Sequence, residues 1–430
     1  MSSTTAPVTR RPNPWWVGVV SGMASYIDAA AIVANGIALV IYQHTIGITP
    51  DQIGILSGIL IFCIAVGALV GGRLGDTFGR RSVFMITMAM IVAGSALMVF
   101  GLSFPLLVAG VILIGLGTGA DLPVSLATIA EAADDKNRGA IIGLSNILWI
   151  IGIVATVLIA TFAGGLGLIG GQLLYAHIGV VSLILLLLRI ALPESPSWLK
   201  ARDERKAGIK TIRADKASFK DLLRGDYLKP FIALLSFYAL TNLAVGTSGS
   251  FSTYIAVNVA GVPVEVYSGL TLLGFPIGIV AGIWFMRIVD TKHRMAYFVL
   301  GAFCLVASFL VPAILGFTMV TMVTSLVLNG IGGAFAFEGI MKVWSQESFP
   351  TMLRSTAQGS IIAVARFLAA ALAVVTPGLI NAGAQTLYFG LAGVMAAGLA
   401  IAWWAFRGVR RTEFDIEGEP DPDAVSAAQA

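Results

Sequence analysis

The segment GRLGDTFGRR at residues 72–81 is a short polar stretch between two long apolar runs. It carries an acid, Asp76, four residues before a base, Arg80. The same order returns 214 positions later, where Asp290 precedes Arg294 after another apolar run. A recurrence of this kind is typical of a chain built from two related units.

A second pair of charges repeats in the same way. Glu131 and Arg138 follow a later apolar run, and Glu347 and Arg354 stand 216 positions further along with the same internal spacing. Two ordered pairs at nearly one offset favour a duplicated six-helix unit over chance matches of single residues. Transporters built from two such units place their substrate near the bilayer midplane, where the units meet.

The composition indicates that lipid is the solvent for most of the chain. Hydrophobic residues make up 57% of the 430 residues and charged residues 12%, and the mean hydropathy is +0.90, far above the balance of a soluble globule. A helix needs roughly 20 apolar residues to cross the hydrocarbon core. We therefore expect an all-α membrane fold with twelve transmembrane helices in two pseudo-symmetric six-helix halves. The predicted spans are 15–42, 52–72, 82–102, 105–132, 139–163, 167–192, 229–258, 266–288, 295–316, 319–345, 355–380 and 383–406.

Polar segments divide the chain and indicate its orientation. Lys and Arg gather in the connections on one side and do not occur in the opposite ones, so the positive-inside rule puts both termini in the cytoplasm. An even number of spans requires the same. We therefore predict a multi-pass protein of the cell membrane. Its expected parts are a cytoplasmic tail at 1–14, a half at 15–192, a cytoplasmic linker at 193–228, a half at 229–406 and a cytoplasmic tail at 407–430.

Four ordered motifs resemble the major facilitator superfamily. GRLGDTFGRR at 72–81 is similar to its cytoplasmic signature after the second helix. PESPSWL at 193–199 resembles the sugar porter signature after the sixth helix, with Ser197 where Arg is usual. The glycines, proline, acid and base of 115–139 resemble the fourth-helix pattern of that subfamily, and ESFP at 347–350 resembles the end of its tenth helix.

Two segments narrow the resemblance. GADLPVS at 119–125 and WSQESFPT at 344–351 look most like bacterial inositol-type or polyol-type transporters within the sugar porter subfamily. The resemblance covers nearly the whole chain. It implies secondary active import of a sugar or polyol by alternating access, driven by a proton gradient and without a cofactor.

The resemblance also implies a cytoplasmic gate, in which acids and bases at the membrane rim pair between helices when that side is shut. The alternative is that these residues only orient helices at the headgroup level. One copy is weaker, because His293 stands where glycine is usual. The implied gate residues are Asp76, Arg80, Glu131, Arg138, Glu194, Asp290, Arg294, Glu347 and Arg354.

Ionised side chains inside the predicted spans indicate candidate working sites, because each costs about 2.5–3.5 kcal/mol at the centre of a helix. Ser21, Ser25, Asp28 and Asn35 share one helical stripe, which we expect to face a wet cavity. In the sugar porters that the chain resembles, an acid at this place carries the transported proton. Asp28 is therefore the leading candidate for proton coupling.

The chain departs from the sugar porter pattern in the fourth helix. Val111 stands where proton-coupled members carry an Arg that pairs with this acid. We expect Asp121 to lie on the cavity side. Either another cation pairs with Asp28 in place of the missing Arg, or Asp121 shares or replaces the role of Asp28. Arg189 and Arg287 lie close to cytoplasmic helix ends, and we expect both to snorkel to the membrane surface.

Glu338, Lys342 and Arg366 fall in the predicted tenth and eleventh helices. Glu338 and Lys342 are four residues apart and can pair along one helix face, while Lys342 and Arg366 occupy positions where sugar porters often carry cavity tryptophans. With Asp28 and Asp121, these charges sum to minus one, so we hypothesise that an uncharged polyhydroxy substrate travels with one proton. Other candidate contacts could equally bond a neighbouring helix: Asn146, Trp149, Thr241, Asn242, Ser248 and Tyr254.

Two other functions stay open. In the first, Lys342 and Arg366 bind an organic anion such as a sugar acid, a sulfonated sugar or an aromatic acid, because Arg forms a bidentate fork with such groups. In the second, the chain is a non-transporting membrane sensor, although no output domain is apparent.

The sequence does not indicate several other classes of function. No constellation indicates an enzyme or a metal site, no Walker-type loop indicates ATP, and topology explains the basic residues better than nucleic acid does. Cys63 and Cys304 fall in apolar runs and indicate buried thiols. The expected partners are a small-molecule substrate and the lipid bilayer, with the chain acting as a monomer.

Overall fold

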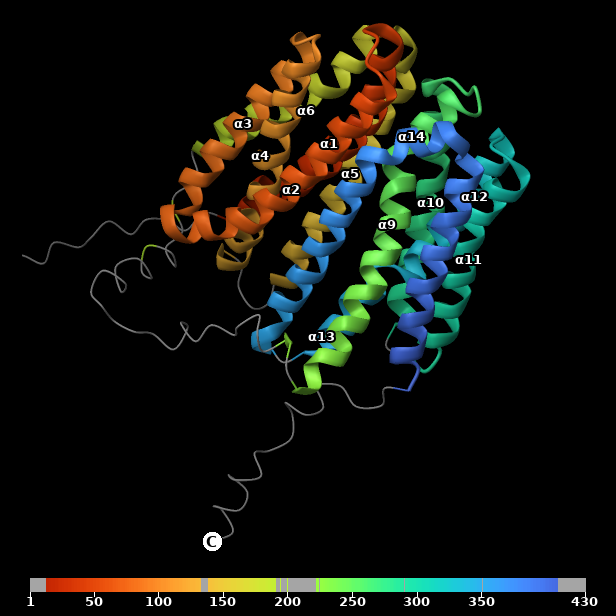
Figure 1. Cartoon of the computed structure of the whole chain (residues 1–430). Helices are drawn as coiled ribbons and strands as arrows, with labels where there is room; N and C mark the ends of the chain where they lie inside the picture. Colours follow the sequence, from red (N-terminus) through yellow and green to blue (C-terminus); the bar gives the residue numbers. More distant parts are fainter. Residues whose placement is uncertain are drawn as a thin grey trace, which may run out of the picture. The chain divides into compact units, whose positions relative to one another are not determined.

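The computed structural model describes residues 13–132, 138–190, 225–289, 291–349 and 351–408, together with residues 194, 199, 222 and 223. These residues contain helices and no strand (Figure 1). The α-helices are α1 (Pro14–Thr45), α2 (Pro50–Phe78), α3 (Arg80–Phe100), α4 (Phe104–Ala132), α5 (Arg138–Ala163), α6 (Leu168–Ile190), α9 (Leu228–Asn258), α10 (Val264–Ile288), α11 (Arg294–Leu315), α12 (Met319–Ala336), α13 (Glu338–Ser348) and α14 (Thr351–Phe406). Two short 3-10 helices are η1 (Gly164–Leu166) and η3 (Gly225–Tyr227).

Eleven helical stretches in the described part of the chain are long and apolar enough to cross a membrane. The last of them, Ala357–Phe406, has 50 residues, which at 1.5 Å per residue is about 75 Å of helix, more than twice the thickness of the hydrocarbon core. It is interrupted by non-helical backbone at Gly383 (φ 166°, ψ 90°), where a new span was predicted to begin. The all-helical membrane fold is confirmed, whereas the count of twelve spans stays a prediction.

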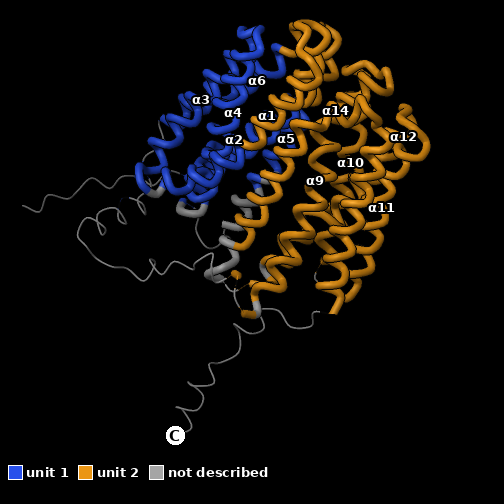
Figure 2. The backbone as a smooth tube through the Cα atoms, viewed as in Figure 1, with its two compact units in different colours: residues 1–34, 63–156, 172–210 blue, residues 35–62, 157–171, 211–430 orange. Residues whose placement is uncertain are grey.

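The chain forms two compact units (Figure 2). Unit 1 comprises residues 1–34, 63–156 and 172–210, and unit 2 comprises residues 35–62, 157–171 and 211–430. Segments 35–62 and 157–171, which carry parts of α1, α2, α5 and α6, therefore belong to unit 2. The division into halves at 15–192 and 229–406 stays a prediction.

Unit 1 is held together by close helix packing. A Cβ added at Gly119 of α4 would lie against the backbone of Ile64 in α2, closer than real side chains approach. Small residues at such contacts allow membrane helices to gain dispersion energy over their whole length. The close contact between α2 and α4 therefore depends on glycine at position 119.

Aromatic side chains form the packed core of unit 2. Trp344 of α13 is 1% exposed and stacks on Phe406 of α14 with ring centroids 4.5 Å apart. Phe237 of α9 and Phe298 of α11 meet its edges at 5.9 and 5.1 Å. Four helices thereby share one apolar anchor, which fixes α13 as part of the unit.

The helix that begins at Met319 does not run unbroken to Ser348. Phe337, with φ −129° and ψ −126°, separates α12 from α13, and the break falls inside the apolar stretch Met319–Ser345. Broken helices at membrane depth occur where the backbone is buried in protein or lines a cavity. The break makes Glu338 the first residue of α13, where the helix dipole favours a carboxylate.

Candidate functional site

A fully buried ion pair joins α4 to α6 in unit 1. Arg189 Nη1 lies 2.5 Å from Asp121 Oδ1, and the two side chains are 0% and 1% exposed. The guanidinium also donates to the Ser125 hydroxyl at 3.2 Å and to the carbonyl oxygens of Val20 and Ser21 in α1 at 3.3 and 3.4 Å. One cation therefore ties three helices of the unit together.

These contacts correct two expectations. Arg189 does not snorkel to the membrane surface, and Asp121 does not face a cavity. The carboxylate neutralises the arginine inside the unit and accepts a further hydrogen bond from the Thr87 hydroxyl at 3.1 Å, while the Phe84 ring lies 4.3 Å from the guanidinium carbon. The proton-coupling role of Asp121 stays a prediction, and this geometry favours a structural role instead.

Arg189 also changes the sum of charges at membrane depth. The sequence-based sum left it out because it was expected at the surface. With Arg189 buried, three acids face three bases and the formal sum is zero rather than minus one. Neutrality therefore no longer demands a bound proton, and a proton taken up by an acid adds one net positive charge to the carrier.

Asp28 is almost completely buried in α1, with 2% of its surface exposed. The stripe that it shares is buried as well, which corrects the expectation of a wet face. Ser25 lies 2.6 Å from the Ser145 hydroxyl of α5, and the Asn35 amide donates to the Ser57 hydroxyl of α2 at 3.3 Å. Hydrogen bonds to neighbouring helices satisfy Ser25 and Asn35, as expected for buried polar groups. The proton-coupling role of Asp28 stays a prediction.

A charged cluster lies on three helices of unit 2. Lys342 Nζ is 2.7 Å from Glu338 Oε1 on α13, which confirms the predicted pairing along one helix face. The Tyr238 hydroxyl of α9 hydrogen-bonds to Glu338 and to Asn242, and the charge of Arg366 on α14 acts on it as well. Sequence reasoning missed Tyr238, although it stands one helical turn before Asn242, which was predicted to contact substrate.

Two predicted substrate contacts are buried and engaged within unit 2. Thr241 is 0% exposed and donates its hydroxyl to the Phe237 carbonyl at 2.8 Å. Tyr254 is 1% exposed and donates to Asn381 Oδ1 at 3.1 Å. In this conformation Tyr254 bonds the neighbouring helix α14, which is the alternative that the sequence left open, whereas Thr241 bonds the backbone of its own helix.

The other predicted contacts are more accessible. Trp149 of α5 is 40% exposed, and Asn242 is partly exposed. Ser248 is partly exposed too, and its hydroxyl lies 3.4 Å from the Tyr388 hydroxyl. Asn146 falls in α5, but its side chain is outside the described part of the structure. Their binding roles stay predictions.

One of the predicted gate residues caps a helix. Glu194 accepts the backbone N–H of Arg80 at 2.9 Å and that of Arg81 at 3.3 Å, at the N-terminus of α3. The Arg81 guanidinium completes this connection by donating to the Ile190 carbonyl at 2.8 Å. A carboxylate at this end satisfies free N–H groups and complements the helix dipole.

A second gate pair ties α11 to α13 in unit 2. Arg294 Nη1 lies 2.6 Å from Glu347 Oε1, with the side chains 21% and 16% exposed. The Glu194 contact lies within unit 1 and the Arg294–Glu347 contact lies within unit 2, and each orients helices of its own unit in this conformation. The gate roles stay predictions, and several of the residues lie outside the described residues or side chains: Asp76, Glu131, Arg138, Asp290 and Arg354.

Glycine packing closes one end of unit 2, near the loop between α1 and α2. A Cβ added at Gly54 of α2 would lie against the Val374 carbonyl of α14, closer than real side chains approach. A Cβ at Gly58 would lie 2.6 Å from the Val374 side chain and 2.9 Å from the Ala370 carbonyl. The two helices touch backbone to backbone here, so this contact forms only with glycine at both positions.

Replacing Gly54 with valine should prevent α2 and α14 from closing, because the new side chain overlaps backbone that cannot move away cheaply. The reporter is a buried thiol introduced as Ser57→Cys in a chain that lacks Cys63 and Cys304. With Gly54→Val, we expect this thiol to react with a soluble maleimide at least tenfold faster than it does when Gly54 is unchanged. The Gly378→Ala change is the matched control, since a Cβ at that position of α14 meets nothing within 4 Å. Equal labelling rates in the two variants would contradict the packing account.

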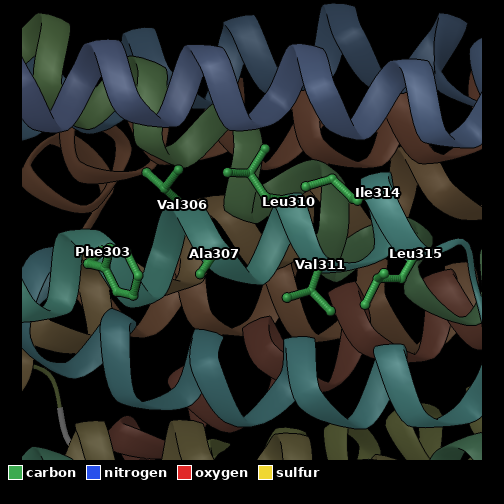
Figure 3. A pocket seen from close by; sticks show the side chains of 7 residues that line it. All are labelled: Phe303, Val306, Ala307, Leu310, Val311, Ile314 and Leu315. Atoms are coloured by element: carbon green, nitrogen blue, oxygen red, sulfur yellow. The ribbon is translucent and has the colours of Figure 1, made fainter.

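A hollow on the surface of unit 2 is lined by one helix (Figure 3). It has a volume of about 320 Å³, and the side chains of α11 that line it are all apolar: Phe303, Val306, Ala307, Leu310, Val311, Ile314 and Leu315. It offers no hydrogen-bonding group to a polar solute. Such a surface suits lipid chains, and we do not assign the transport site to it.

The chain is similar to known membrane transport proteins over nearly its whole length. Residues 15–374 match the family described as Major Facilitator Superfamily. The "Minor myo-inositol transporter IolF" of Bacillus subtilis is 35% identical over 392 residues, covering 89% of this chain and 88% of the relative. The "3-(3-hydroxy-phenyl)propionate transporter" of Escherichia coli is 27% identical, covering 87% of this chain and 89% of the relative.

A solved structure has the same fold. The inward-open xylose transporter XylE from E. coli aligns with a TM-score of 0.75, covering 94% of this chain and 99% of that chain, at 16% identity. At this identity the likeness concerns the fold alone.

Proposed function

The chain belongs to the major facilitator superfamily, and from that premise we propose that it imports an uncharged polyol of the inositol type together with protons. The similarity to a myo-inositol transporter over nearly the whole chain supports the substrate class. The pairing of Lys342 with Glu338 at 2.7 Å is the observation that carries the choice of an uncharged substrate. A lysine that is already neutralised offers hydrogen bonds to hydroxyl groups rather than a free cation to an acid.

In the proposed function, each remaining part of the chain has a role. The chain works in the cell membrane as a monomer with both termini in the cytoplasm, and its halves at 15–192 and 229–406 exchange access to the two sides. The charged loop residues act as the cytoplasmic gate, and Asp28 carries the proton. The end of unit 2 closed by Gly54 is the outer side. Ion gradients drive transport without a cofactor.

The second candidate is import of an organic anion, such as a sugar acid or an aromatic acid. It is favoured by Arg366, the second cation of the charged cluster, and by the similarity to the hydroxyphenylpropionate transporter. A charge sum of zero also allows an anion and a proton to travel together without moving net charge.

Competition for uptake separates the two candidates. In proteoliposomes that take up labelled myo-inositol, we expect unlabelled inositol isomers to compete and glucuronate or 3-phenylpropionate not to compete. The Lys342→Ala variant should weaken polyol uptake without abolishing it. Uptake of labelled glucuronate that Lys342→Ala abolishes would establish the anion candidate in its place.

A further inference from the structure

Building on the proposed function, we propose that the Glu338–Lys342 pair recognises two adjacent hydroxyl groups of the polyol as one unit, and that Tyr238 is the positioning residue that holds Glu338 for it. Polyols and their deoxy analogues differ by such hydroxyl groups. Two adjacent hydroxyl groups are therefore the feature of the substrate that decides specificity.

The pair is accessible although it lies on a membrane-spanning stretch. The side chains of Lys342 and Glu338 are 42% and 43% exposed, and the break at Phe337 sets α13 apart from α12 within one apolar run. Two ionised groups facing hydrocarbon would be strongly disfavoured, so their open side faces water or substrate.

Tyr238 supports Glu338 from the buried side. Its side chain is 4% exposed, and its ring stacks on Phe337 with centroids 5.7 Å apart and an interplanar angle of 23°. The hydroxyl bonds to Glu338 and is itself held by Asn242. The carboxylate is thereby fixed by a tyrosine whose own position is fixed by packing, which is the arrangement that preorganises a binding group.

The pair retains hydrogen-bonding capacity toward a ligand. A carboxylate has about four acceptor sites and an ammonium group has three donors, so contacts with each other and with Tyr238 leave both groups partly free. Their nearest atoms are 2.7 Å apart, close to the separation of the two oxygens in a gauche vicinal diol. One hydroxyl can donate to Glu338 while its neighbour accepts from Lys342.

If the substrate lacks either hydroxyl group, the residue that would bind it, Glu338 or Lys342, loses that hydrogen bond. Sites built to bind a hydroxyl group discriminate strongly against analogues that lack it. Because this pair is partly exposed, we expect a KM at least about tenfold higher for the deoxy analogue, with the effect confined to two adjacent ring positions.

The test measures uptake of inositol and of each monodeoxy-inositol in proteoliposomes. The Glu338→Gln/Lys342→Met variant removes both charges together, and we expect its KM ratios at the two adjacent positions to fall together toward one. Tyr238→Phe should raise the KM for inositol, with little change in kcat, and lower the same ratios in part. Tyr297→Phe is the control, since the described contacts of Tyr297 are ring contacts with Trp284 and Phe335.

A second variant keeps the test decisive if the double variant does not fold. Glu338→Asp retains the charge but withdraws the carboxylate by one methylene group, so it should lower the same two ratios. Unchanged ratios in the folded variants, or sensitive hydroxyls that are not adjacent, overturn the proposal while inositol uptake stands. If the unmodified protein takes up no polyol, the proposed function fails and this inference fails with it.

Discussion

Replacing Arg189 with methionine is expected to lower the free energy of unfolding by about 3–5 kcal/mol, the usual effect of breaking a buried ion pair. The loss leaves the Asp121 carboxyl group without its partner in the interior of unit 1, where it is 1% exposed, and releases two carbonyl groups of α1 from their donor. Thermal unfolding of the purified protein in detergent measures the effect directly. Because uptake depends on folded protein, transport should fall along with the yield.

Two further variants distinguish the effect of breaking the ion pair from the effect of losing an arginine side chain. Asp121→Asn/Arg189→Met removes both charges, and we expect it to recover most of the lost stability, because no unpaired charge remains. Arg287→Met is the matched control, since Arg287 is exposed near the end of α10. If Arg189→Met is as stable as Arg287→Met, the buried pair does not have the structural role assigned to it.

The Asp28→Asn variant is expected to abolish accumulation of substrate against its gradient while leaving exchange of labelled for unlabelled substrate intact. An amide has the shape of the carboxyl group but cannot take up and release the transported proton. Asp28 is 2% exposed in α1, so its replacement removes an ionisable group from the interior of the membrane domain. Accumulation and counterflow assays on the same proteoliposomes give the two readings.

Asp51→Asn serves as the control for loss of a carboxylate, because Asp51 is exposed in the first turn of α2. It should accumulate substrate like the unmodified protein. Full accumulation by Asp28→Asn would mean that another group carries the proton. Loss of both accumulation and exchange would indicate instead that Asp28 is needed for folding or substrate binding.

The class of fold was predictable from the sequence because each membrane helix has a local signal, a long run of apolar residues. Each apolar run is long enough to span the hydrocarbon core, and the run ends were marked by polar residues such as those of 72–81. Pairing between Glu338 and Lys342 was predictable for the same reason, since it depends only on spacing along one helix. Family membership was predictable because several motifs occur in the expected order along the chain.

Contacts between helices were not predictable in this way. A helical stripe shows which residues share a face, but it does not show what packs against that face. Arg189 near a helix end fitted snorkelling as well as burial, and only the position of Asp121 on another helix decides between them. Thr241 was assigned to substrate for its hydroxyl group, although the carbonyl one turn earlier satisfies it.

The break at Phe337 had no clear sequence signal either. No proline stands at the break, and Gly332 and Gly333 lie a full turn before it. The break follows from packing, since Phe337 stacks on Tyr238 and Trp344 anchors α13 in the aromatic core. Tyr238 could have been found from the sequence by asking which polar side chain lies one turn from Asn242.

The most direct test of proton-coupled polyol import is inositol uptake into proteoliposomes under an imposed pH gradient, acidic outside, with the pH of the outer solution recorded. We predict accumulation of inositol with simultaneous alkalinisation outside. Uptake should be stimulated by a membrane potential that is negative inside, since the charges at membrane depth sum to zero and each proton carries one positive charge across. Accumulation that persists after collapse of the pH gradient and follows a sodium gradient instead would contradict the account.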